Sequence, residues 1–542
     1  MTLLTGIPAS PGVAVGPARI LERISLNIPE VKQETQDSET EMARFHRAVE
    51  ISVAEMKAIR EEAKKKLQKG VAEVFTAHLL MLEDPVLLDG VSARVRDSGL
   101  TVESALAATV RDLAGQFEKL EDAYFRERAA DVRDIGTRIL TNLKHVDGEQ
   151  RTTAPGVLVT EELLPSDALT LDAARVVGIA TEKGGVTSHA SIIARSLGIP
   201  CVVGVTGLLE NVQENDELAL DGSTGEVYIH PDEKTKRRLE SLAGQIKRRK
   251  ETALKKKDEP AITKDGRRIM VLANAASLAD MEKAIANGAE GIGLFRTEFL
   301  FLDRKEMPTE EEQAAAYRAV AEAAAGKPVA IRLLDIGGDK PAQYLKIPRE
   351  MNPFLGLRAV RLLLERPAVL RTQLRAILRA AQAGNVSILV PMVTDICELN
   401  AIKEHAISCR TELEQEGIML PQVSIGAMIE VPAAALCAER LAQAADYFSI
   451  GTNDLTQYCM AVDRGNAAVA NLYQPAHAAV LSLIDNTVKA AHAMGIKVGV
   501  CGEAAADEKI VPLLVRLGVD SLSVSPAAVP EVKEYIRALN MH

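Results

Sequence analysis

The repeat that decides the fold is clearest at residues 425–454, IGAMIEVPAAALCAERLAQAADYFSIGTND. A short apolar run, Ile425–Glu430, is followed by a helical stretch and then by a second run, Tyr447–Gly451. Apolar runs of this length, with helix-forming sequence between them, are typical of β/α units that build a parallel sheet. The segment therefore predicts an α/β domain in which polar residues follow directly after the strands.

The same unit recurs on both sides of this segment. Six further runs lie between residue 261 and the C-terminus, at Ile269–Asn274, Gly291–Phe295, Val329–Leu334, Val386–Met392, Lys497–Cys501 and Asp520–Val524. Eight units within about 280 residues match the size of a (β/α)8 TIM-type barrel. A doubly wound open sheet is the alternative, because the number of strands alone does not prove closure.

Polar residues gather at the expected strand ends, where a barrel places its active site. They are Arg296-Thr297-Glu298, Arg332, Asp335, Glu430, Asn453-Asp454, Asp463-Arg464 and Cys501-Gly502-Glu503. Each one taken singly is better explained as part of a structural ion pair. Taken together, the arginines suit phosphate and carboxylate oxygens, and the acids suit Mg²⁺ that also binds substrate oxygens. The barrel therefore predicts a small phosphorylated anion as substrate.

The first 260 residues follow a different pattern. Apolar residues at helical spacing, such as Met42, Phe45 and Val49, predict an all-helical unit at roughly 36–145. Periodicity cannot distinguish a plain bundle from one that presents a face to a partner. Short strand signals at 1–20 and 150–230 predict a small β/α domain, and 231–260 reads as a charged helical linker. The basic run in the linker is better explained as a solvated face than as a nucleic-acid site.

A second candidate site lies outside the barrel, at residues 183–195, KGGVTSHASIIAR. Two glycines open a helix that Thr187 or Ser188 can cap, and His189 falls in its first turn. A helix N-terminus disfavours an imidazolium and so favours the neutral, nucleophilic ring. Amide groups there can also hold a phosphoryl group. A capping histidine without chemistry is the alternative, but the phosphate-binding barrel favours catalysis.

Composition narrows the class of protein. The net charge of −11 argues against general attraction to nucleic acid or membranes. We expect neither a signal peptide nor a membrane span, because no basic and apolar leader and no apolar stretch of about 18 residues occurs. The six cysteines form no C-x-x-C pair, so we expect a cytoplasmic protein without a zinc site or disulfides.

These motifs resemble those of enzyme I of the sugar phosphotransferase system, the phosphoenolpyruvate–protein phosphotransferase family. The resemblance runs from about Ser10 to Pro526. It rests on several specific blocks, ERAADVRDIG at 127–136, the segment 184–195, GLFRTEFLF at 293–301, DIGGDK at 335–340, NPFLG at 352–356 and SIGTNDLTQY at 449–458.

The resemblance implies an order of domains and a function for each of them. Residues 1–20 and 146–230 would form a swivelling phosphohistidine domain, with a helical domain for the phosphocarrier protein HPr inserted at 21–145. The linker 231–260 would lead to a barrel at 261–542 that binds phosphoenolpyruvate and forms a homodimer.

The resemblance also implies roles for single residues. His189 would take the phosphoryl group and pass it to HPr, and Cys501 would protonate the enolate to give pyruvate. Arg296, Arg332, Asn453, Asp454, Arg464 and Arg358 would bind substrate, and Glu430 with Asp454 would hold Mg²⁺. Two departures are Val186, where many members have arginine, and a chain that stops soon after its last helix.

Two rival functions fit parts of the sequence. A pyruvate phosphate dikinase or phosphoenolpyruvate synthase shares the histidine domain and the barrel but needs an ATP-binding domain. The first 150 residues show no glycine-rich phosphate loop. A regulatory protein with decayed catalysis is the other rival, although every residue with an implied chemical role is present.

Overall fold

The computed structural model describes the chain in two compact units, Met1–Ile246 and Lys247–His542. The described residues are 1–542 without 22–27, 33–37, 67–77, 119–122, 147–154, 164–174, 186–187, 189, 192–193, 196–197, 303, 305, 338–341, 349, 465, 467–468, 470–471 and 542. Within them, no helix is both long and apolar enough to cross a membrane.

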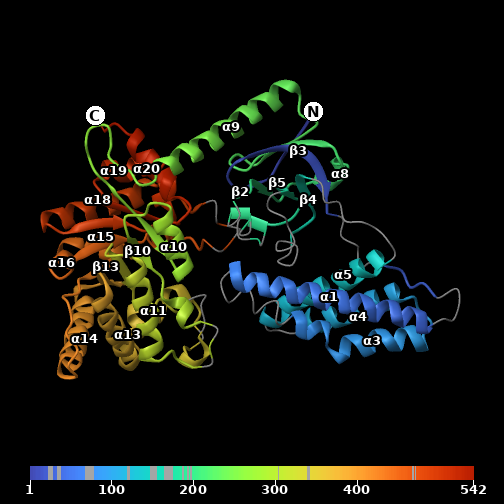
Figure 1. The fold of residues 1–542 in the computed structure, drawn as a ribbon, viewed down its shortest axis with the longest axis horizontal. Coiled ribbons are helices and arrows are strands. Elements are labelled where there is room, and N and C mark those ends of the chain that lie inside the picture. The colour runs from blue at the N-terminus through green and yellow to red at the C-terminus, as the bar shows by residue number, and fades with distance from the viewer. Residues whose placement is uncertain are drawn as a thin grey trace. The chain divides into compact units, whose positions relative to one another are not determined.

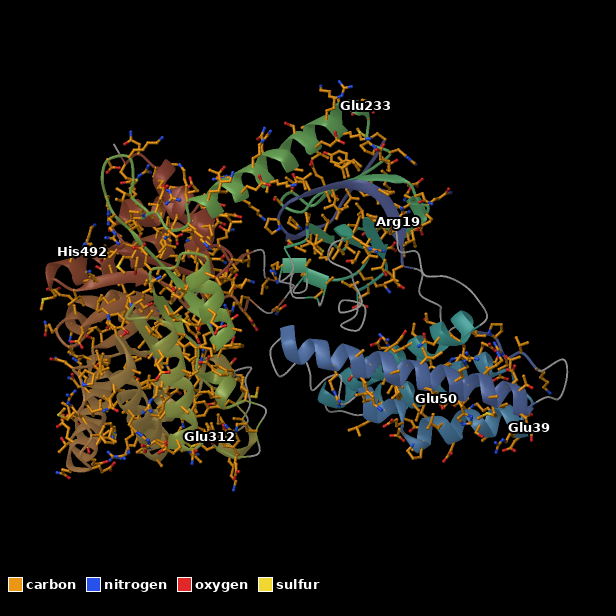
Figure 2. All side chains as sticks on the ribbon, in the orientation of Figure 1. Arg19, Glu39, Glu50, Glu233, Glu312 and His492 are labelled. Atoms are coloured by element: carbon orange, nitrogen blue, oxygen red, sulfur yellow. The ribbon has the colours of Figure 1, made fainter. Side chains whose placement is uncertain are left out.

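The first unit contains a bundle of helices (Figure 1). These are α1 (Ser38–Lys66), α3 (Pro85–Asp97), α4 (Val102–Glu118) and α5 (Ala123–Val146). Phe45, Ile135 and Ile139 are buried in its core, whereas Glu39 and Glu50 are exposed on α1 (Figure 2). The expected helical unit is therefore confirmed, and its apolar stripes face inward as the spacing predicts.

An eight-stranded mixed sheet forms the other part of the first unit. Its order is β1-β8-β7-β3-β4-β5-β6-β2, and the short helix α8 (Leu208–Asn211) follows β6. The strands are β1 (Thr2–Thr5), β2 (Ile7–Ser10), β3 (Val13–Ile20), β4 (Gly156–Thr160), β5 (Val176–Thr181), β6 (Cys201–Val203), β7 (Glu217–Asp221) and β8 (Glu226–Ile229). Because β3 pairs in parallel with β4, the helices between them are an insertion in this sheet domain.

The strands β7 and β8 form a hairpin, since they pair in antiparallel register from Leu218–Ile229 to Asp221–Glu226. Gly222 follows β7 directly, and a Cβ atom there would lie 1.9 Å from the Ser10 carbonyl oxygen. The close approach of the two backbones explains why this turn position has no side chain.

The second unit is built on a closed barrel of eight parallel strands. They are β9 (Met270–Ala275), β10 (Ile292–Phe295), β11 (Val329–Arg332), β12 (Val386–Val390), β13 (Ile425–Ile429), β14 (Tyr447–Ile450), β15 (Lys497–Val500) and β16 (Ser521–Val524). All eight expected runs are strands, and β16 pairs with β9, so closure excludes the open sheet. The TIM-type fold class is confirmed.

Helices connect the strands of the barrel (Figure 1). They are α10 (Leu278–Ala286), α11 (Glu310–Ala323), α12 (Ala359–Glu365), α13 (Pro367–Ala380), α14 (Ile396–Gln415), α15 (Pro432–Leu436), α16 (Ala438–Ala442), α17 (Thr452–Met460), α18 (Ala478–Ala493), α19 (Val511–Leu517) and α20 (Val529–Ala538). Short 3₁₀ turns include η1 (Glu298–Leu300), directly after β10. These connections place the start of each strand at one end of the barrel and its finish at the other.

The linker is the helix α9 (Glu233–Lys255). Its first half packs on the sheet domain, where Leu239 is buried with Ala219 and Tyr228. Its second half meets the barrel unit, where Arg249 pairs with Glu508 at 2.7 Å. Each end of the linker therefore has contacts of its own.

We predict that Thr309→Ala destabilises the barrel unit by about 1 kcal/mol, because Thr309 caps α11 in a capping box with Glu312. Scanning calorimetry should show its transition lowered by about 2 °C. Thr309→Ser keeps the hydroxyl and should melt near the native temperature. An unchanged Thr309→Ala transition contradicts the assigned cap.

Candidate active site

The candidate site is assembled where the strands of the barrel end. Arg332 is the last residue of β11, and Arg296, Glu430 and Cys501 directly follow β10, β13 and β15. Asn453 and Asp454 lie in the first turn of α17, just after β14. Because parallel strands of a closed barrel end at one rim, these residues share one end of the barrel.

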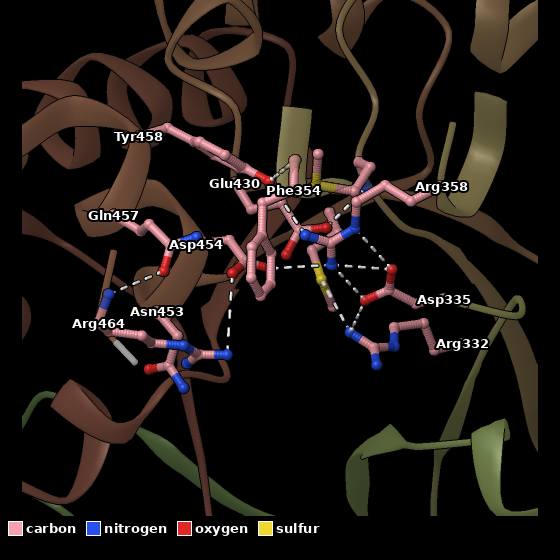
Figure 3. Close-up of polar contacts among 12 residues, drawn as sticks. Arg332, Asp335, Phe354, Arg358, Glu430, Asn453, Asp454, Gln457, Tyr458 and Arg464 are labelled. Atoms are coloured by element: carbon pink, nitrogen blue, oxygen red, sulfur yellow. Dashed lines mark hydrogen bonds and ion pairs between the residues drawn. The ribbon is translucent and has the colours of Figure 1, made fainter. Parts of the chain in front are cut away.

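Asp335 joins two arginines of this site (Figure 3). The Arg358 guanidinium donates to Oδ1 and Oδ2 of Asp335 at 2.9 and 3.0 Å from Nη2, and Nε donates to Oδ1 at 3.2 Å. Arg332 Nη1 lies 3.2 Å from Asp335 Oδ2. Arg358 also contacts Asp454 Oδ2 at 3.4 Å and the Tyr458 hydroxyl at 3.0 Å. One buried carboxylate thus fixes both guanidinium groups.

Arg332 has a second carboxylate partner in Glu298. Its Nη2 donates to Glu298 Oε1 at 2.8 Å, and both side chains are buried. Burial alone would lower the pKa of Arg332, but Glu298, Asp335 and Glu430 raise it above its usual value. The guanidinium is therefore charged, and its buried Nε has no hydrogen-bond partner among the described residues.

Glu430 and Asp454 form the acidic side of the site. Glu430 is buried and accepts a hydrogen bond from the Met392 amide at 2.7 Å. Burial, and then the charges of Asp454 and Asp335, raise the pKa of Glu430 well above its usual value. Asp454 Oδ1 has no hydrogen-bond partner in the described part of the chain. Crowded carboxylates with an unpaired oxygen are suited to a divalent cation.

Three predicted ligands lie around this cluster. Arg464 is partly exposed, with Nη2 3.9 Å from Asp454 Oδ1. Asn453 accepts a hydrogen bond from the Glu503 amide at 2.9 Å. Arg296 is exposed, and its pKa is lowered by the surrounding protein and then by the nearby charge of Arg332. The guanidinium groups of Arg296 and Arg464 are accessible to an incoming anion.

Cys501 lies in an apolar part of the same end of the barrel. It packs with Leu294, Leu389 and Met428, and its Sγ is 3.6 Å from the Ile450 carbonyl oxygen. Burial raises the pKa of the Cys501 thiol to about 11. The thiol is therefore protonated at neutral pH, as a proton donor must be.

The second predicted site is only partly described, and His189, Val186 and Thr187 lie outside the described residues. Ser188 lies just before the helical residues 190–191, and its Oγ is 3.4 Å from the Ser191 amide nitrogen. Ser191 Oγ donates to the Gly185 carbonyl oxygen at 2.7 Å. Ser188 thus lies at the position of a helix cap, one of the two that the sequence suggests.

Contacts through Asp335 connect the predicted barrel residues Arg332, Arg358, Asp454 and Arg464. Glu430 makes no direct contact with them among the described residues, but its charge raises the pKa of Arg332 and of Arg358. Asn453 and Cys501 lie on neighbouring strand ends. Sequence reasoning placed Glu298 and Asp335 at strand ends but gave neither a role. Their signal was a carboxylate two or three residues after an arginine at a strand end, which does not reveal the pairing across strands.

Comparison with known proteins identifies the class. Models described as PEP-utilising enzymes match the chain in three places, the N-terminal part at 5–128, the mobile domain at 152–225 and the PEP-binding domain at 250–541. The barrel and its strand-end cluster are thus those of a PEP-utilising enzyme.

Full-length relatives show which family of PEP-utilising enzymes the chain belongs to. Proteins named phosphoenolpyruvate-protein phosphotransferase from Priestia megaterium and Haemophilus influenzae are 40% and 41% identical, over 99% of this chain and 94% of theirs. The one from Bacillus subtilis is 40% identical over 100% of this chain and 95% of its own length. The chain belongs to the phosphoenolpyruvate–protein phosphotransferase family, as the sequence motifs predict.

The raised pKa of Cys501 predicts its reactivity, because only the thiolate is alkylated. Between pH 7.5 and 9.5 the iodoacetamide rate at Cys501 should rise about tenfold per pH unit without levelling. Peptide mass spectrometry measures this rate, with the exposed Cys437 as internal reference. A rate that levels off near pH 8 contradicts the protonated thiol.

Proposed function

We propose that the chain transfers the phosphoryl group of phosphoenolpyruvate to a ring nitrogen of His189 and then to a histidine of an HPr-like carrier. The observation that carries this proposal is the strand-end cluster of arginines, two crowded carboxylates and a protonated thiol in a PEP-binding barrel. The resemblance to enzyme I implies that this transfer is the first step of sugar uptake through the phosphotransferase system.

The arginines supply most of the substrate binding. Arg296, Arg332, Arg464 and Asn453 hold the phosphate and carboxylate of phosphoenolpyruvate, and Arg358 reaches the phosphate from beside Arg332. Phosphoryl transfer requires positioning and charge neutralisation more than covalent help. Preorganised guanidinium groups provide both, since Asp335 holds Arg332 and Arg358 in place before substrate enters.

Mg²⁺ fits the residues that the resemblance implies. Glu430 and Asp454 would hold it, and this fit is supported by the raised pKa of Glu430 and by Asp454 Oδ1, which accepts no hydrogen bond from the described residues. The described residues contain no group of three or more His, Cys, Asp or Glu side chains placed for a metal, so water and substrate oxygens would complete its coordination. Bound there, Mg²⁺ offsets negative charge on the phosphoryl oxygens.

Cys501 acts on the enolate that remains after phosphoryl transfer. When the P–O bond of phosphoenolpyruvate breaks, the phosphorus bonds to the His189 nitrogen and the enolate of pyruvate remains. The Cys501 thiol donates its proton to the methylene carbon and yields pyruvate. The resulting thiolate regains a proton from solvent. The pKa of about 11 keeps the Cys501 thiol protonated at neutral pH.

The division of labour follows the expected domains. Residues 1–20 with 146–230 carry His189, 21–145 dock the carrier, 231–260 are the hinge region, and 261–542 bind phosphoenolpyruvate and form a homodimer in the cytoplasm. The histidine domain must visit the barrel and then the carrier, so the linker has to permit a swing.

We predict that the purified protein takes label from phosphoryl-labelled phosphoenolpyruvate with Mg²⁺ and without ATP, and releases pyruvate. The label should be acid-labile and alkali-stable, as on a phosphohistidine. His189→Ala should lose both label and pyruvate release. His492→Ala, at an exposed histidine on α18, should retain them (Figure 2).

A different result would favour one of the rivals. A requirement for ATP favours a dikinase or synthase. No label on a well-folded native protein favours a regulatory role. Label that persists in His189→Ala rejects His189 as the acceptor.

A further inference from the structure

Glu298 makes contacts that the proposed chemistry does not yet use. It lies in η1, two residues after Arg296, and the residue is only 5% exposed. Its Oε1 accepts from the Arg332 guanidinium at 2.8 Å and from the Asp335 amide at 3.2 Å. A single buried oxygen therefore connects the segments that follow β10 and β11.

The backbones of these two segments are held by other groups. Thr297 Oγ1 donates to the Arg332 carbonyl oxygen at 3.0 Å, and Gln373 Nε2 donates to Thr297 Oγ1 at 3.2 Å. Gln373 Oε1 accepts from the Leu334 amide at 2.9 Å. Because Thr297 and Gln373 already tie the backbones, the distinctive contact of Glu298 is with the Arg332 side chain.

The charges give Glu298 a second effect. The surrounding protein lowers the pKa of Arg296, the nearby charge of Arg332 lowers it further, and the charge of Glu298 opposes this shift. A carboxylate near both arginines reduces their repulsion while the site is empty. The geometry of the hydrogen bond then decides which way the Arg332 fork points.

We propose that Glu298 is a positioning residue that orients the Arg332 guanidinium for phosphoryl transfer. The proposal rests on the proposed function, because Arg332 is taken to bind phosphoenolpyruvate. Arg332 Nε is left without a partner in the described residues, and Nη1 and Nη2 are fixed by Asp335 and Glu298. The orientation of the Arg332 guanidinium is therefore fixed before a ligand binds.

The test is a double-mutant cycle on the full-length protein. Single-turnover phosphorylation by phosphoenolpyruvate is measured for native protein, Glu298→Gln, Arg332→Gln and the double variant. Displacement of a catalytic group can lower the rate about a hundredfold. The kcat/KM of Glu298→Gln should therefore be lower than that of the native protein by roughly this factor. In the Arg332→Gln background the same change should alter the rate by less than about threefold.

Two further variants separate positioning from stability. Glu310→Gln removes a partly buried glutamate that pairs with Arg375 and Arg379 at 2.7 and 2.8 Å and has no part in the candidate site. It should lower the melting temperature but leave kcat/KM within about twofold of native. Glu298→Asp keeps the carboxylate but withdraws it by one methylene, and should reduce kcat/KM about tenfold only when Arg332 is present.

The outcomes discriminate between the claims. Additive effects of the Glu298 and Arg332 changes, in either the Gln or the Asp series, reject positioning through Arg332. So does a Glu298→Asp variant with native kcat/KM. If the native protein accepts no phosphoryl group, the proposed function has failed instead.

Discussion

The site depends on one carboxylate, Asp335, held between the guanidinium groups of Arg332 and Arg358. Two arginines buried this closely repel each other, and an acid between them turns the repulsion into a fixed arrangement. The barrel makes this possible, because β11 ends at Arg332 and Asp335 follows three residues later at the same rim. Arg358 then extends the pairing to Asp454.

That extension links the two halves of the proposed chemistry. Arg358 contacts both Asp335 and Asp454, so it lies between the arginines proposed to bind the phosphate and the carboxylates proposed to hold Mg²⁺. Cys501 is different, because apolar neighbours rather than charges keep its thiol protonated. Charge pairing and desolvation thus act side by side at one rim.

The sequence predicts most of this fold, because the β/α repeat has runs of characteristic length and spacing. It also predicts the membership of the site, since polar residues after parallel strands must share an edge. It does not predict partnerships such as Glu298 with Arg332, 34 residues apart, or Arg358 with Asp454, 96 residues apart. These pairs form because the barrel closes and brings strand ends together, and no local sequence pattern predicts which residues then meet. The role of His189 stays a prediction, since it lies outside the described residues.

The most direct test of the account is a crystal structure of full-length His189→Ala with phosphoenolpyruvate and Mn²⁺ in place of Mg²⁺. The account predicts one anomalous peak bonded to Glu430 and Asp454, with substrate oxygens on the same ion and on Arg332. Arg358 should have moved off Asp454 Oδ2. A metal bound elsewhere, or substrate that does not touch Arg332, would contradict the assignment of this rim as the site of phosphoryl transfer.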